Sequence, residues 1–228
     1  MHPLLSPGAG PIPGVPSQQP SNLFRFGEIT LYSTHNFPAS SVLANGTNRV
    51  FSTQLGQTGQ GYATGLSRSE TNLKEGGRIP TGQAYDVYGV AAQIIGTNGG
   101  TGNEPDLTQN ISFQAITNNN LLQNVVNNGV LAWDFTQTNV DICPIMLAGA
   151  GGGVYGSVGT GNAINVGALN NGNGGIWMYR KHPVALPGAT TFAVIIGFGS
   201  RTADVAAAEG CAIRIVLLGY YKSVIEIG

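Results

Sequence analysis

Short apolar runs rich in β-branched and aromatic residues alternate along this chain with clusters of Gly, Asn and Pro. Runs of this kind are typical of β-strands, and the Gly, Asn and Pro clusters mark the turns between them. Residues 84–89 alternate, with Tyr85, Val87 and Gly89 on one face and Ala84, Asp86 and Tyr88 on the other, which predicts that one of the two faces is buried. Strands are predicted at residues 28–33, 49–52, 84–95, 111–116, 130–136, 141–147, 175–180, 190–198 and 211–227.

Residues 212–221 form a run that is apolar on both faces except at Arg214, a pattern that suits a central strand. Only residues 119–127 could form a helix, and their Asn content predicts a short helix or none. No stretch approaches the roughly 20 apolar residues of a membrane-spanning helix, so no transmembrane segment is expected. Short strands with little helix favour an antiparallel two-sheet sandwich.

Two segments of the chain, residues 78–87 and 184–194, resemble each other. Each has an apolar residue, a Pro/Gly turn, and then an aromatic residue and a Val two positions apart. Proline fixes the turn and cannot donate a hydrogen bond within a sheet, so each segment is predicted to be a corner where the chain enters a strand. Corners of this kind also occur in β-sandwiches generally, which leaves the meaning of the similarity open.

The N-terminal residues 1–24 contain no Lys, Arg, Asp or Glu, and Pro interrupts them repeatedly. They are predicted to be an extended arm, either a free tail or a segment that orders against a neighbouring subunit, and residues 25–228 are predicted to be a single sandwich domain. The arm has no cation before Arg25, so we do not expect it to bind nucleic acid strongly. It also lacks the basic start and apolar core of a secretory signal, so a primary translation product with this start is expected to be made in a cytosol.

Composition separates this chain from an ordinary enzyme or a coiled coil. Of its 228 residues 9% are charged, against about 25% in a typical soluble domain, and the net charge is −1. The surface must therefore consist largely of uncharged polar side chains and glycine backbone. A nearly neutral surface favours association between copies. A secreted β-protein with a neutral surface is the alternative.

Three segments resemble the jelly-roll capsid proteins of tailless icosahedral bacteriophages: residues 79–87, 186–194 and 213–221. In that family an apolar-Pro-x-Gly turn opens a core strand, an apolar-Pro-Gly turn leads into a Phe-x-Val strand, and an apolar strand with a Gly-aromatic break closes the fold. Larger members have two jelly rolls, whereas this chain has room for one. The resemblance implies an all-β, antiparallel jelly-roll-like sandwich with an extended N-terminal arm.

The same resemblance implies a structural virion protein, most simply a major capsid protein that self-assembles into an icosahedral shell. Its partners would be copies of itself and other virion proteins, with weak or indirect nucleic-acid contact and room for lipid contact on the inner face. The protein would be made in the host cytoplasm and located in the virion. A minor virion component, such as a penton, spike or cement protein, would share these features.

Two other classes of protein stay open at this point. A carbohydrate-binding or receptor-binding sandwich would expose Trp133, Trp177 or Tyr155 as a platform for sugar stacking. A hydrolase would need two close carboxylates in a cleft. The carboxylates available for such a pair are Asp86, Asp134, Asp141 and Glu104.

The remaining motifs give little indication of chemistry. The histidines His2, His35 and His182 lack the close spacing of a metal site. Glu104 and Asp106, with Asn103, could form a weak calcium site, but the loop lacks a recognised calcium pattern and solvated turn residues are the simpler interpretation. Ser157 and Ser200 do not lie in a nucleophile elbow.

Gly151, Gly153 and Gly156 satisfy a dinucleotide-binding fingerprint in spacing alone. No helix is predicted after them, and Trp177 and Met178 stand where an acid would be needed about 20 residues on. We therefore expect a long flexible loop over residues 157–173, or a glycine-lined subunit contact.

One cationic cluster, Arg180–Lys181–His182, precedes a proline turn. It could contact nucleic acid, an acidic partner or lipid headgroups, although a solvated corner is the usual role of such a triplet. Cys143 and Cys211 are too few for a disulfide framework and are predicted to be buried free thiols. We expect no enzymatic activity and assign no catalytic, cofactor-binding or metal-binding residue.

Overall fold

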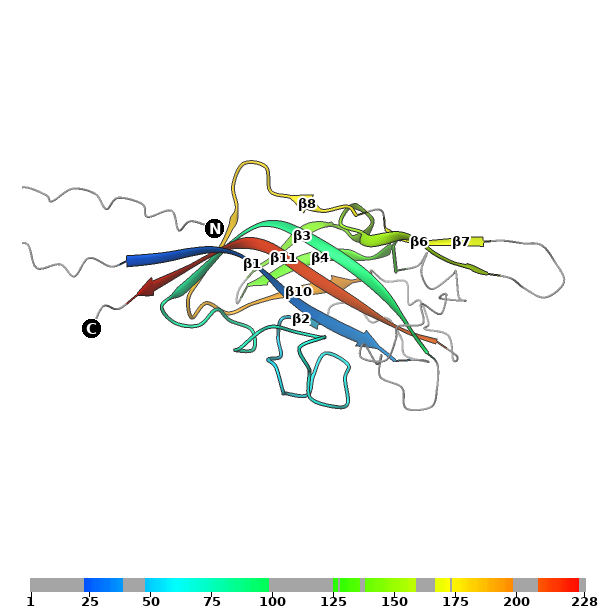
Figure 1. Ribbon diagram of the computed structural model, residues 1–228, viewed down its shortest axis with the longest axis horizontal. Coiled ribbons are helices and arrows are strands. Elements are labelled where there is room, and N and C mark those ends of the chain that lie inside the picture. Colours follow the sequence, from blue (N-terminus) through cyan, green and yellow to red (C-terminus); the bar gives the residue numbers. More distant parts are fainter. Residues whose placement is uncertain are drawn as a thin grey trace, which may run out of the picture.

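Antiparallel β-strands make up most of the computed structural model (Figure 1), which describes residues 23–38, 48–98, 125–126, 128–135, 138–158, 167–172, 174–198 and 209–225. The strands are β1 (Leu23–Phe37), β2 (Arg49–Val50), β3 (Gln83–Asn98), β4 (Val130–Phe135), β5 (Thr138–Pro144), β6 (Ala150–Val158), β7 (Gly167–Gly172), β8 (Trp177–Met178), β9 (Val184–Pro187), β10 (Phe192–Gly197) and β11 (Glu209–Ile225). A 3-10 turn, η1 (Ile145–Leu147), follows β5, and residues 125, 126 and 128, at the end of the segment where only a short helix was expected, are helical.

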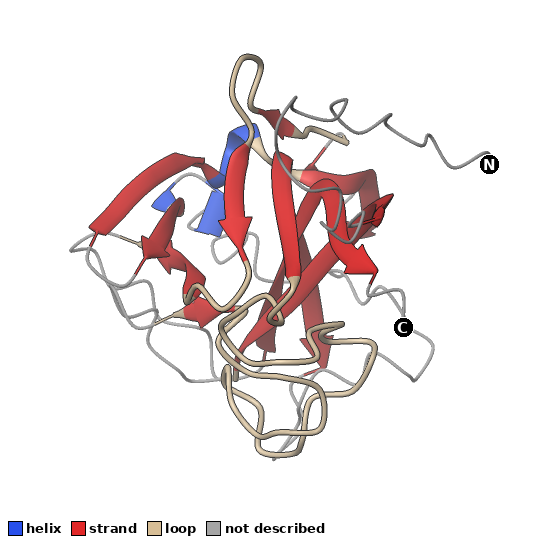
Figure 2. Ribbon diagram, turned by 90° about the vertical axis from the view of Figure 1, so that its left-hand side faces the viewer, coloured by secondary structure: helices blue, strands red, loops and turns tan. Residues whose placement is uncertain are grey.

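Two antiparallel sheets pack face to face (Figure 2). The larger sheet has the order β1-β11-β3-β8, with β9 also paired to β3, and the smaller has the order β2-β10-β4-β5. Strands β6 and β7 form a separate hairpin. Apolar side chains from the inner faces of both sheets join in one core, which includes Tyr85, Ile213 and Leu217 from the larger sheet and Leu131 and Ile196 from the smaller. The all-β sandwich predicted from the strand pattern is therefore confirmed.

The strand pairs are nested along the chain. Strand β1 pairs with β11, β2 with β10, β3 with β8 and β9, and β4 with β5. Further pairing of β11 with β3 and of β10 with β4 joins these pairs into the two sheets. The arrangement is equivalent to one long antiparallel hairpin that has been rolled up, so the first and last described strands lie side by side.

Strand β11 lies between β1 and β3, as its apolar sequence predicted. The inner-facing Ile213, Ile215 and Leu217 have no exposed surface. The alternation at the start of β3 is confirmed as well, since Tyr85 and Val87 are buried. A β-bulge opposite Leu218 and Gly219 then places Gly89 on the outer face, so the prediction that it shares the face of Tyr85 and Val87 is wrong.

Several strand boundaries differ from prediction, for local reasons. The strand expected to continue to residue 147 ends at Pro144, because proline has no N–H to donate to a ladder, and the chain then turns into η1. The strand expected at residues 49–52 stops at Val50, since Phe51 adopts a positive φ of 67°. The strand expected at residues 175–180 shortens to Trp177–Met178.

The prediction of a loop over residues 157–173 is wrong for the part that the structure describes, because residues 157–158 belong to β6 and residues 167–172 form β7, which pairs with it. Gly and Asn have low strand propensity, but backbone pairing between the two segments outweighs it. Strand β9 was expected to be part of a corner only; it is an edge strand, where Pro187 is tolerated. The strand predicted at residues 111–116 and the arm up to residue 22 lie outside the described residues, and β1 begins at Leu23.

The two similar Pro/Gly corners lie against each other. The Ala189 N–H donates to the Ile79 carbonyl at 2.9 Å, and Arg78 and Thr191 form an isolated β-bridge. The corner at Gly82 leads into β3, and the corner at Gly188 links β9 to β10. Both segments therefore enter strands as predicted, and they also stabilise each other.

A long loop, residues 51–79, lies along the outer edge of β1 (Figure 1). The Asn36 N–H donates to the Gln60 carbonyl at 2.8 Å, and the Tyr32 N–H donates to Asn72 Oδ1 at 2.9 Å. Unpaired edge strands can pair with other chains. Hydrogen bonds from the loop occupy part of the β1 edge, so that part is not open to pairing with another chain.

Candidate interaction surface

Apolar side chains gather on the outer face of the larger sheet, where Leu218, Gly89 and Met178 lie in register across β11, β3 and β8. A Cβ built on Gly89 would lie 3.0 Å from Met178 Sδ, 3.2 Å from Ile176 Cγ2 and 3.4 Å from Leu218 Cδ1. These three side chains therefore converge above the Gly89 backbone. Ile176 and Met178 remain 42% and 46% exposed, so the cluster faces outward.

An aromatic pair continues this surface toward β1. The rings of Tyr88 and Tyr220 have centroids 5.1 Å apart, and Tyr220 is 50% exposed. Glu28 stands opposite Tyr220 in the β1–β11 register and accepts a hydrogen bond from the Tyr88 hydroxyl. This hydrogen bond raises the pKa of Tyr88 to about 12, so the hydroxyl stays protonated and the carboxylate stays fixed at this edge.

The surface formed by Glu28, Tyr88, Ile176, Met178, Leu218 and Tyr220 is called the outer stripe below. It crosses the sheet from β1 to β8, with a carboxylate at the β1 end. Next to Tyr88 and Tyr220, Asp86 and Lys222 form an ion pair that balances their charges.

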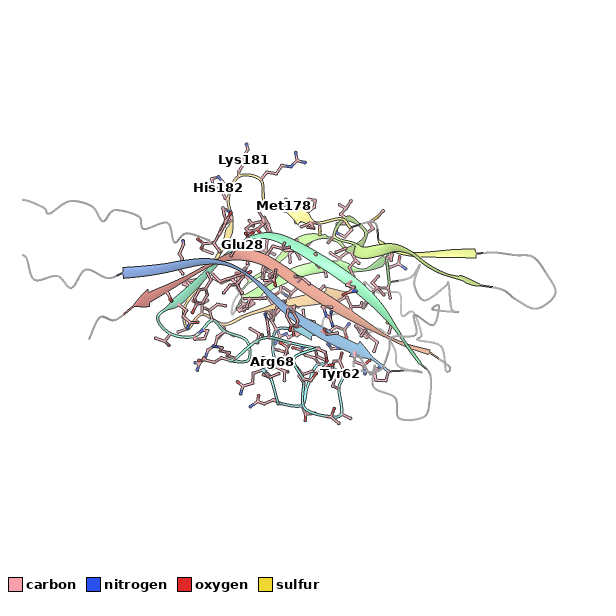
Figure 3. All side chains as sticks on the ribbon, viewed as in Figure 1. Glu28, Tyr62, Arg68, Met178, Lys181 and His182 are labelled. Atoms are coloured by element: carbon pink, nitrogen blue, oxygen red, sulfur yellow. The ribbon has the colours of Figure 1, made fainter. Side chains whose placement is uncertain are left out.

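The cationic cluster predicted from the sequence lies at the other end of the outer stripe. Arg180, Lys181 and His182 are exposed in the loop between β8 and β9. Figure 3 shows Lys181 and His182 projecting at the top of the view, above Met178 and Glu28, whereas Arg68 and Tyr62 lie at the bottom, in the loop at residues 51–79. The ion pairs between described residues do not include Arg180, Lys181 or His182.

The sequence indicates the apolar strand and the cationic cluster that contribute to this surface, but not the surface itself. The run at residues 212–221 is apolar on both faces, which predicted a strand covered on both sides. In the structure Leu218 is half-buried and Tyr220 is exposed, whereas Arg214 is held under the loop at residues 51–79 by a hydrogen bond to the Ser69 carbonyl at 2.6 Å. Only part of the outer face is therefore covered by described residues.

The aromatic residues proposed as a sugar platform do not form one where they are described. Trp133 is 2% exposed, and its Nε1–H donates to the Tyr179 hydroxyl at 2.8 Å. Trp177 is half-buried against the core. The side chain of Tyr155 lies outside the described part, and among the described aromatic residues Tyr220 is exposed instead.

The candidate carboxylates are not gathered in a cleft by the described structure. Asp86 is paired with Lys222 in the larger sheet, and Asp134 with Arg49 at 2.6 Å in the smaller. Asp141 is exposed on β5, and Glu104 lies outside the described residues. Asp134 and Asp141 lie on the same face of the adjacent strands β4 and β5, two positions apart in register, but Asp134 is already engaged by Arg49.

Both cysteines are buried free thiols, as predicted. Burial raises the pKa of Cys143 to about 11 and that of Cys211 to about 12, so neither is a thiolate nucleophile at neutral pH. His35 is partly buried on β1, and burial lowers its pKa to about 4. His182 is exposed, and His2 is not described.

The remaining predicted motifs supply no site. Gly151, Gly153 and Gly156 lie within strand β6, which pairs with β7 rather than leading into a helix. Ser157 is on the same strand, and Ser200 and the Asn103, Glu104 and Asp106 loop are outside the described ranges. Within those ranges no three His, Cys, Asp or Glu residues are grouped to hold a metal ion, and no helix is long and apolar enough to cross a membrane.

Comparison with protein-family models, with curated proteins and with solved structures gave no match for this chain.

Proposed function

We propose that this protein is a structural subunit of a virus particle, most simply a major capsid protein that associates with copies of itself to form a shell. The observation that carries the proposal is the outer stripe: an apolar, aromatic surface on the outside of a sheet in a chain with 9% charged residues. Exposed apolar patches on soluble proteins mark interaction sites. Weak repulsion between copies makes another copy of the chain the natural partner.

We propose, more specifically, that the sandwich is a jelly roll. A jelly roll has eight strands in two sheets and contains two Greek keys. If β8 and β9 are counted as one interrupted strand, the nested pairs and the two four-strand orders described above follow this topology. The β6–β7 hairpin is then an insertion between the fifth and sixth strands. Fold does not imply function, so this topology supports the capsid proposal only together with the surface.

Shell assembly places several demands on a subunit, and the described features are compatible with them. A sandwich with a large buried core gives a rigid body, and the loop at residues 51–79 protects one sheet edge from uncontrolled pairing. The N-terminal segment before β1, which contains no Lys, Arg, Asp or Glu, would add contacts to neighbouring subunits. Other virion proteins, weakly bound nucleic acid and lipid at an inner face remain proposed partners, and a minor virion role would use the same features.

Sedimentation velocity and negative-stain microscopy of the expressed full chain test the proposal. We expect oligomers at micromolar concentration and rings or closed shells under assembly conditions. A monodisperse monomer at high concentration, unchanged when other virion proteins are added, would contradict it. Binding of glycans through Tyr220 by such a monomer would instead favour the carbohydrate-binding alternative.

A further inference from the structure

We propose that the outer stripe is a two-fold interface, on which a second copy of this chain docks with the same surface turned by half a rotation. This inference rests on the proposed function and specifies which surface makes one of the contacts between copies. In a two-fold interface, whatever residue i contacts on its partner, the partner's residue i contacts in return. The surface must therefore be complementary to itself.

The distribution of charge across the sheet has this property. The strand order β1-β11-β3-β8 places Glu28 at one edge and the loop with Arg180 and Lys181 beyond the other. A two-fold axis that lies in the contact plane, parallel to the strands and between β11 and β3, turns the second copy face down onto the first and exchanges these two edges. Glu28 of each copy would then face Lys181 of the other, giving two equivalent ion pairs at the rim.

The centre of the outer stripe supplies the apolar contact. Tyr220 and Met178, at 50% and 46% exposed, lie on either side of the proposed axis, on β11 and β8. Tyrosine and methionine are enriched in interface cores, where their area is buried with few hydrogen bonds to satisfy. The Asp86–Lys222 ion pair on the same face is already neutralised within one chain, so it adds no net charge to the contact.

Charge-reversal variants test the pairing. Lys181→Glu and Glu28→Lys each create two repulsive contacts in a two-fold dimer, because the axis repeats the substitution. We expect each variant alone to raise the dissociation constant of the contact by about tenfold or more. The double variant should recover most of the affinity, and an equimolar mixture of the two single variants should form 1:1 dimers, since each mixed pair again joins opposite charges.

Matched controls separate this surface from general effects of charge. Lys74→Glu makes the same change at an exposed lysine of the loop at residues 51–79. It should leave association unchanged. Tyr220→Ser tests the apolar centre and should weaken association at least as much as Lys181→Glu. Sedimentation equilibrium measures the affinity, and thermal melting of each variant confirms folding, which Lys181→Glu at an exposed loop should not alter.

Each outcome supports or overturns the inference. If the wild type assembles and the Lys181, Glu28 and Tyr220 variants assemble equally well, the interface is elsewhere and the inference fails while the proposed function stands. If Tyr220→Ser weakens assembly but charge reversal has no effect, the face is used without the two-fold pairing, and the inference also fails. If the wild type never associates, both fail. Loss of binding to anionic vesicles by Lys181→Glu in a chain whose assembly is unaffected would assign the face to lipid.

Discussion

The ring of Tyr85 on β3 lies against the backbone of Gly219 on β11. A Cβ built on Gly219 would be 2.6 Å from two ring carbons of Tyr85 and 2.5 Å from the Asp86 carbonyl oxygen. The Tyr85 hydroxyl lies within hydrogen-bonding distance of the Ile29 and Leu217 carbonyls. This one side chain therefore joins β1, β3 and β11, and it can do so only because residue 219 has no side chain.

Gly219→Ala should destabilise the fold. Neither the ring nor the backbone oxygen can move away cheaply in a packed sheet, so we expect a loss of roughly 1–3 kcal/mol, measured by denaturant unfolding. Gly27→Ala on the adjacent strand β1 is the matched control, because a Cβ there meets nothing within 4 Å. Equal stability of the two variants would show that Tyr85 does not pack on Gly219.

Ile215→Asp or Leu217→Asp should abolish folding, because both side chains are fully buried at the centre of the larger sheet. A buried unpaired carboxylate costs several kcal/mol, against the roughly 5–15 kcal/mol that stabilises a whole domain. Arg180→Ala, at an exposed loop, should change stability by less than about 0.5 kcal/mol. Circular dichroism and solubility provide the comparison, and sharply melting Asp variants would contradict the central position of β11.

The stability of the fold should decrease as the pH falls from about 6.5 to about 4. Burial lowers the pKa of His35 to about 4 from 6.5, so in this window the unfolded chain binds a proton that the folded chain does not. Neutral His35 gives its full contribution to stability above about pH 6.5. At most about 3 kcal/mol of the free energy of unfolding is lost by pH 4. Its ring lies 4.6 Å from that of Phe37, and its Nδ1 lies 3.4 Å from the Arg49 carbonyl oxygen.

Melting temperatures from pH 7.5 to 4 measure this dependence. His35→Gln should flatten the part of the curve that belongs to this side chain. Identical curves for the wild type and the His35 variant would show that carboxylates alone account for the acid sensitivity.

Arg214→Met should loosen the loop at residues 51–79 without unfolding the sandwich. The guanidinium donates to the Ser69 carbonyl at 2.6 Å and to Thr34 Oγ1 at 3.3 Å, and it lies over the Tyr32 ring at 5.8 Å. Loss of these contacts should cost about 2 kcal/mol, or roughly a 30-fold rise in the open population of the loop. Tryptic cleavage after Arg68 measures this opening. Arg49→Met, which breaks an ion pair in the smaller sheet, is the control.

Deletion of residues 1–20 should leave the melting temperature of the subunit unchanged and lower the yield of assembled particles. The segment has no Lys, Arg, Asp or Glu and many prolines, so it can add little to a core and would gain order only from neighbouring copies. A truncated chain that fails to fold would show that the segment belongs to the sandwich.

The sequence determined the class of fold, because side-chain period, β-branched content and turn residues act locally. The alternation at Tyr85 and Val87 and the apolar run at Ile213, Ile215 and Leu217 placed two neighbouring core strands correctly. The Pro/Gly corners were visible for the same reason. Burial of Cys143 and Cys211 followed from the behaviour of a free cysteine as a small hydrophobic residue.

The tertiary structure decided what depends on partners distant in the chain. Strand β7 exists because β6 pairs with it, although Gly and Asn disfavour strands. The contact between the corners at Ile79 and Ala189 joins segments that no local pattern relates. The outer stripe also could not be predicted from the sequence. A residue such as Tyr220 gives a strand the same apolar pattern whether its face of the sheet is covered or exposed to solvent. Only the packing of the other elements decides between the two.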